Sequence, residues 1–60
     1  SVPDDVATAL EDQPQAKRFF EGLSYSSKLR LVLAIQAAKT DDTRQRRIAK
    51  TVSGLAEGRA

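Results

Sequence analysis

Apolar residues recur along the chain at spacings of three and four positions, which predicts helices rather than strands. Val6 and Leu10 lie four residues apart, and Ala16, Phe20 and Leu23 continue the same kind of spacing further on. Alternation of apolar and polar residues with the period of a strand is almost absent. We therefore predict an all-α fold, a small compact bundle of four short helices forming a single domain over residues 1–60.

Helix start and stop signals place the boundaries of these four segments. Two prolines, Pro3 and Pro14, are suited to the first turn of a helix. Two hydroxyl residues, Ser24 and Thr40, are suited to the N-cap position. We expect the third helix to run to about Lys39. Asp41 and Asp42 then fall in the first turn of the fourth helix, where the helix dipole favours acids, and Gly58 is suited to end that helix.

We expect large apolar side chains from the last three segments to share one core. Its predicted members are Phe19, Phe20, Leu23, Val32, Ile48, Val52 and Leu55. A chain of this length buries only about 60% of its extended surface, and its core supplies about 3–5 kcal/mol of net stability. Loss of one large core side chain should therefore unfold the domain.

The segment 24–39 has apolar residues on nearly opposite sides of the expected helix. Leu29 and Leu33 belong to one stripe, whereas Leu31 and Ile35 belong to the other. A helix that is apolar all round is normally buried on all sides, so this helix is predicted to be central in the bundle. In the alternative, Leu31 and Ile35 form an exposed interface with another chain or another domain.

Composition excludes several kinds of chemistry. The 60 residues contain no Cys and no His, which removes the usual zinc sites, disulfides and Cys/His or Ser/His/Asp catalysis. Adjacent acidic pairs such as Asp41-Asp42 diverge around a helix and do not converge as acid and base. The longest apolar run, residues 31–35, is far shorter than a membrane span. We expect no enzyme activity, no cofactor, no metal and no membrane span.

The basic run near the end of the chain separates into two pairs on a helical wheel. Arg46 and Lys50 point away from the apolar face, and Asp42 precedes Arg46 by four residues, as in an ordinary surface ion pair. Arg44 lies on the apolar face, and Arg47 lies at its border. Acids or helix-terminal carbonyls of the same domain would satisfy these two arginines; in the alternative, they hold an anion or a partner carboxylate.

The segments VPDDVATAL, QAKRFFEGLSYSS and AIQAAKTDDTRQRRIAKTVSGLAEGR resemble the C-terminal helical domain of the bacteriocin-protection, YdeI/OmpD-associated family. The resemblance covers almost the whole chain, and Thr43, Arg44, Arg47 and Ile48 carry its most specific motif. The chain departs from the family pattern at LRLVLA, which is more aliphatic. The resemblance implies a bacterial protein in which another domain precedes this one, and a role in protection against bacteriocins or in association with an outer-membrane porin.

Two classes of function are compatible with this sequence. We expect a non-enzymatic protein-interaction or accessory domain whose partner is another protein or an N-terminal domain of the same protein, with self-association as a further alternative. The second class is a weak nucleic-acid-binding module that uses Arg46 and Lys50. Nucleic acid is the less favoured partner, because the net charge is only +2 and no aromatic residue interrupts the basic run. The sequence leaves the compartment open and favours the cytoplasm over the periplasm.

Overall fold

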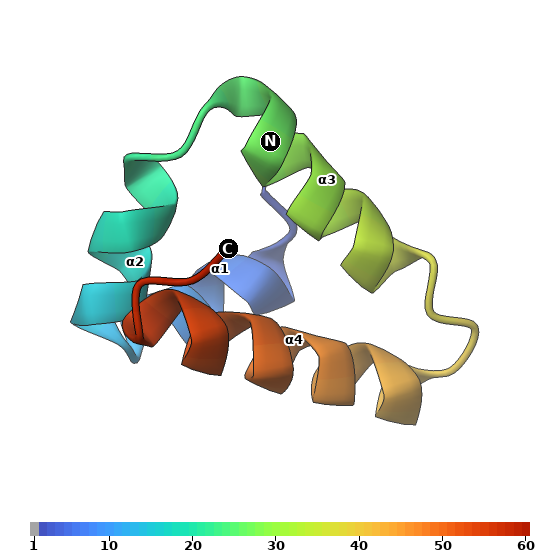
Figure 1. Ribbon diagram of the computed structural model, residues 1–60. Coiled ribbons are helices and arrows are strands. Elements are labelled where there is room, and N and C mark those ends of the chain that lie inside the picture. Colours follow the sequence, from blue (N-terminus) through green and yellow to red (C-terminus); the bar gives the residue numbers. More distant parts are fainter. Residues whose placement is uncertain (1) are drawn as a thin grey trace.

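The computed structural model describes residues 2–60, and all of the regular structure in that range is helical (Figure 1). The four helices, in chain order, are α1 (Asp4–Glu11), α2 (Pro14–Glu21), α3 (Tyr25–Gln36) and α4 (Asp41–Ala56). The longest helix, α4, runs along one side of the molecule, and α2 and α3 rise from its two ends. The predicted fold class and number of helices are confirmed.

Local sequence signals set most helix starts. The hydroxyl oxygens of Ser24 and Thr40 each accept a hydrogen bond from the backbone N–H three residues later, both at 3.2 Å. Both residues are thus N-caps, as predicted. Pro14 occupies the first turn of α2, but Pro3 is the residue before α1 rather than its first helical residue.

The two longer helices end in different ways. Gly58 adopts a φ of 81°, and the N–H groups of Gly58 and Arg59 donate to the carbonyls of Leu55 and Gly54 at 2.9 and 2.8 Å. This left-handed cap confirms Gly58 as the stop signal of α4. The prediction that α3 reaches Lys39 is wrong, because α3 ends at Gln36. The extended backbone that the next N-cap requires forces the chain to leave the helix beforehand.

The core lies where α1, α2 and α3 meet α4, which packs against all three. The main cluster of buried side chains comprises Val6, Leu10, Ala16, Phe20, Ile35, Ile48, Val52 and Leu55. Val32 is also buried, and Leu23 is partly buried against the cluster. The prediction for Phe19 is wrong, because its side chain is 36% exposed. Neighbouring helical residues diverge by about 100°, so the turn that places Phe20 inside carries Phe19 toward the surface.

The structure also corrects the expectation for the third helix. α4, rather than α3, is the helix that contacts all the others. Ile35 is only 1% exposed and Leu31 is partly buried against the core, so the alternative in which these two form an exposed interface is wrong. Instead, Leu29 and Leu33 on the other side of α3 remain 42% and 53% exposed. The bundle is too small to cover both sides of this helix.

Candidate functional site

Arg44 is held by a carboxylate from the first helix. Its Nε donates a hydrogen bond to Asp5 Oδ2 at 2.6 Å, and its Nη2 donates to Asp5 Oδ1 at 2.9 Å. The two side chains are partly buried, with 24% and 35% of their surfaces exposed. This bidentate contact gives Arg44 a carboxylate partner within the domain, the first of the two alternatives that the sequence left open, and it links α1 to α4.

The pair changes the acid–base behaviour of both groups. Hydrogen bonds from Arg44 lower the pKa of Asp5 from its ordinary value of 3.8 to about 2, against a smaller opposing effect of burial. The same hydrogen bonds raise the pKa of Arg44. Asp5 is therefore ionised throughout the physiological pH range. Neither group is suited to exchange a proton near neutral pH.

Arg47 donates a hydrogen bond to a backbone carbonyl near the end of a neighbouring helix. Its Nη1 donates to the carbonyl oxygen of Ala34 at 2.7 Å. Ala34 lies in the last turn of α3, where backbone carbonyls lack partners within the helix. Arg44 and Arg47 therefore both have structural partners of the two kinds anticipated from the sequence.

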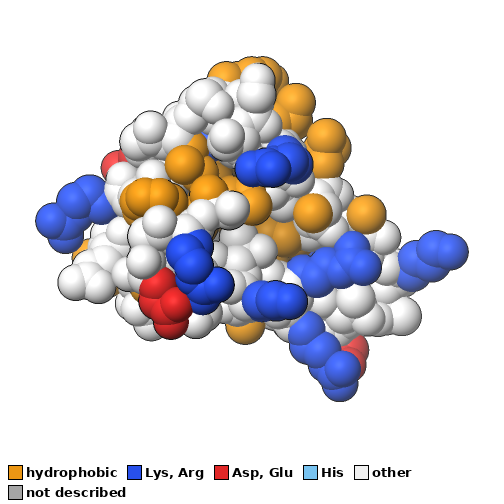
Figure 2. Space-filling view, viewed as in Figure 1, with side chains coloured by type: hydrophobic (Ala, Val, Ile, Leu, Met, Phe, Trp, Pro, Cys, Tyr) orange, Lys and Arg blue, Asp and Glu red, His pale blue; other side chains and the backbone are white. Residues whose placement is uncertain are grey.

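Arg46 and Lys50 lie on the solvent side of α4. Arg46 Nη2 is 3.0 Å from Asp42 Oδ2, and both side chains are more than 70% exposed. This confirms the predicted pair at a spacing of four residues, which contributes little to stability in water. Lys50 is exposed as well. Figure 2 shows Lys and Arg side chains gathered over α4 on this face, with few acids among them.

The outer face of α3, defined here as Tyr25, Leu29 and Leu33, is the main exposed apolar feature. These residues follow one another at intervals of four and are 79%, 42% and 53% exposed. Side chains at this spacing lie in a row along one side of a helix. Phe19, the other exposed large apolar side chain among the described residues, is on α2. The outer face of α3 thus presents a continuous apolar ridge to solvent.

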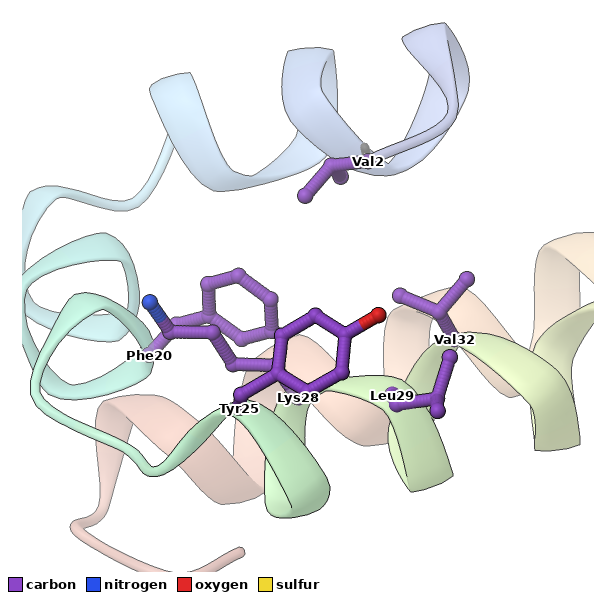
Figure 3. Close-up of a pocket in the computed structure, with 6 residues that line it drawn as sticks. All are labelled: Val2, Phe20, Tyr25, Lys28, Leu29 and Val32. Atoms are coloured by element: carbon purple, nitrogen blue, oxygen red, sulfur yellow. The ribbon is translucent and has the colours of Figure 1, made fainter.

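A pocket of about 230 Å³ opens beside this ridge (Figure 3). Its walls come from three parts of the chain and consist of Val2, Phe20, Tyr25, Lys28, Leu29 and Val32. In the close-up, Val2 lies across the pocket from the α3 side chains. The lining is almost wholly apolar, which suits the insertion of a hydrophobic side chain.

Lys28 supplies the charge of this pocket. Its Nζ lies 5.7 Å from the centre of the Phe20 ring, within the range of a cation–π contact. Among the described residues, no Asp or Glu lines the pocket. The site therefore combines an apolar surface with a positive charge.

The sequence interpretation missed Tyr25, Leu29 and Leu33 as surface residues. It recognised the stripe that contains Leu29 and Leu33, but it predicted burial on all sides of this helix and, in the alternative, exposure of Leu31 and Ile35 instead. Tyr25 extends that stripe by one more step of four residues, and a tyrosine tolerates exposure better than an aliphatic residue. This extension was the available signal for the exposed stripe.

Two kinds of feature are absent from the part of the chain that the structure describes. Within residues 2–60, no helix is long and apolar enough to span a membrane. No group of three or more acidic, His or Cys side chains in this part of the chain is arranged to hold a metal ion.

Comparison with known proteins gives one result. The family model described as "Bacteriocin-protection, YdeI or OmpD-Associated" matches residues 1–58. Comparisons with curated proteins and with solved structures gave no match. The match covers all four helices, including the motif residues Thr43, Arg44, Arg47 and Ile48.

Proposed function

The chain belongs to the bacteriocin-protection, YdeI or OmpD-associated family, and from this premise we propose that it is a non-enzymatic domain that binds protein. We further propose that the outer face of α3 is the binding surface. Protein binding agrees with the association that the family's description mentions.

The exposure of three large apolar side chains in a row on one helix carries this proposal. Tyr25, Leu29 and Leu33 remain in contact with water although the domain has only a small core to stabilise it. Contiguous apolar surface with a pocket beside it is typical of protein–protein interaction sites. The buried residues Phe20 and Val32 line that pocket, so the core itself shapes the surface.

The chemistry of the side chains supports a binding role rather than catalysis. The chain has no Cys and no His. The arginine nearest to the core, Arg44, makes both of its hydrogen bonds to Asp5 inside the domain. Removing either partner would weaken the fold, so these residues serve the domain's structure.

Site-specific photo-crosslinking in the protein's native cells tests the proposal. A benzoylphenylalanine placed at Leu33 should form adducts with another protein. The same group at Ala49, which is exposed on α4, is the control and should form few adducts. Equal yields at the two positions, or no adduct at Leu33, would contradict the proposal.

Nucleic-acid binding by α4 is the second candidate, favoured by the basic side chains gathered over that helix in Figure 2. The ion pair of Arg46 with Asp42 argues against it, because it offsets one of the charges available to phosphates. If Arg46 and Lys50 contact phosphates, duplex binding must weaken linearly in log salt, and loss of one contact must reduce that slope by about one. We expect no duplex binding even at low salt.

A further inference from the structure

We infer that the partner of the outer face of α3 is an acidic amphipathic helix that inserts one large apolar side chain into the pocket lined by Phe20 and Val32. The inference rests on the proposed function and specifies the class of partner. It combines three observations: the row of apolar residues, the pocket beside it and the sign of the charges on α3.

The spacing and the pocket favour a helical protein segment. Tyr25, Leu29 and Leu33 form a ridge along α3, and a partner helix can place its own apolar residues against such a ridge at spacings of three and four. The pocket of about 230 Å³ is large enough for one bulky side chain. A flat lipid surface would bury the ridge but would leave the pocket unfilled. We therefore favour a protein segment over a membrane.

The charges around this surface require an acidic partner. Residues 22–40 contain Lys28, Arg30 and Lys39 but no Asp or Glu. On a helical wheel, Lys28 borders the ridge on the side of the pocket, and Arg30 borders it on the opposite side. A partner with acids on both flanks of its apolar face would meet both cations. A partner with basic flanks would meet like charges, which weakens binding and selects against it.

The same charges disfavour self-association through this surface. In a symmetric dimer each copy offers the same patch, so Lys28 and Arg30 of one copy would approach those of the other. Two acids, Glu11 and Glu21, line a second hollow of about 270 Å³ that shares Val2, Phe20 and Lys28 with the first. Glu11 in that hollow is already paired with Lys17, 2.5 Å away. Neither acid lines the pocket beside the ridge, where two copies would meet.

Two synthetic peptides test the inference directly. Each peptide is about 15 residues long, which is enough for marginal helicity in water. Both peptides carry the same apolar face of Leu and Trp. They differ only in the residues that flank this face, which are Glu in one peptide and Lys in the other. The protein has no Trp, so peptide fluorescence reports binding without interference. At low salt the Glu peptide should bind at least about tenfold more tightly than the Lys peptide, and this preference should shrink as ionic strength rises to about 0.15 M.

Charge reversal identifies the residues responsible. Arg30→Glu should reduce the preference for the Glu peptide, and the double change of Lys28→Glu with Arg30→Glu should reverse it. Lys50→Glu, on α4, is the matched control with the same change in net charge, and it should leave the preference intact. Circular dichroism should show that each variant is folded. If Arg30→Glu and Lys50→Glu reduce the preference for the Glu peptide equally, the preference reflects net charge alone. That result would overturn the inference.

The remaining outcomes separate this inference from the proposed function. Equal binding of both peptides, lost in a Leu33→Gln variant, overturns the acidic partner but keeps α3 as a protein-binding surface. Binding of neither peptide, with crosslinks at Leu33 retained, overturns the amphipathic helix alone. If crosslinking at Leu33 also fails, the proposed function fails too. Binding to vesicles of phosphatidylglycerol and phosphatidylcholine, with no binding of either peptide, would identify a membrane surface instead.

Discussion

Alanine substitutions at Ile35 and Leu33 test which side of α3 faces the core. Ile35 is 1% exposed, so Ile35→Ala leaves a cavity and should cost about 2–5 kcal/mol. Leu33 is 53% exposed, so folding removes only about half of its side chain from water. Complete burial of a leucine is worth about 1.5–3 kcal/mol, which leaves about 1 kcal/mol for Leu33→Ala.

These costs must be compared with the stability of the whole domain. A core of this size supplies about 3–5 kcal/mol, so Ile35→Ala should be largely unfolded at room temperature. The milder Ile35→Val change keeps the comparison measurable, since it should cost about 0.5–1.5 kcal/mol. Losing one buried methyl group at Ile35 should therefore destabilise the domain about as much as losing most of the side chain at Leu33.

Thermal and urea unfolding followed by circular dichroism provides the assay. In a domain of this size, a loss of about 1 kcal/mol lowers Tm by about 4–8 °C. Ile35→Val and Leu33→Ala should both fall near this range, whereas Ile35→Ala should give little folded signal. If Leu33→Ala is as damaging as Ile35→Ala, then the outer face of α3 belongs to the core and cannot serve as a free binding surface.

Three further predictions concern the core and the Asp5–Arg44 pair. Phe20→Ala should cost about 3–5 kcal/mol and unfold the domain by circular dichroism, whereas Phe19→Ala should leave a folded protein; a stable Phe20→Ala variant would remove that ring from the core. Arg44→Lys should lower Tm because lysine cannot make the bidentate contact with Asp5, and Arg44→Ala should lower Tm further. Arg46→Ala should reduce the free energy of unfolding by less than about 1 kcal/mol, because its ion pair is exposed. An Arg44→Ala variant that melts like the parent would contradict the structural role of Arg44. Because the pKa of Asp5 is lower in the folded state than its ordinary 3.8, the pair's contribution is present above that value and is lost as pH falls toward about 2. The difference in urea midpoint between the parent and Asp5→Asn should therefore disappear over this interval, and a constant difference would refute the assignment.

Helix boundaries were predictable where a single side chain determines them. Ser24 and Thr40 cap their helices through contacts three residues away, and Gly58 adopts the left-handed conformation that ends α4. Such signals are local and are visible in the sequence. The end of α3 was predicted three residues too late because no glycine or proline marks it; the following cap determines it instead.

The pairing of Arg44 was predictable in kind but not in its partner. Its position on the apolar face indicated a carboxylate, a backbone carbonyl or a bound anion as its partner, without indicating which one. Arg44 pairs with Asp5 rather than Asp4 because of the way α1 packs on α4. That packing depends on residues far apart in the chain, so no local sequence pattern predicts it. The same limit applies to the contact of Arg47 with the carbonyl of Ala34.

The orientation of α3 was the part of the fold that was predicted wrongly from the sequence. Its two apolar stripes have similar hydrophobicity, so periodicity alone gives no preferred face. The choice depends on how much surface α4 and its neighbours can cover. They cover Ile35 and Leu31 and leave Leu29 and Leu33 outside. The exposed residues thus reflect the small size of the bundle.

Identification of the segment captured by a crosslinker at Leu33 tests the central claim most directly. Mass spectrometry of the adduct from native cells should locate the linked residue in an acidic, amphipathic helical segment of another protein or of a neighbouring domain. The captured segment should carry Asp or Glu on both flanks of its apolar face, opposite Lys28 and Arg30. A crosslink to a basic segment, to a lipid or to a second copy of α3 would contradict the account.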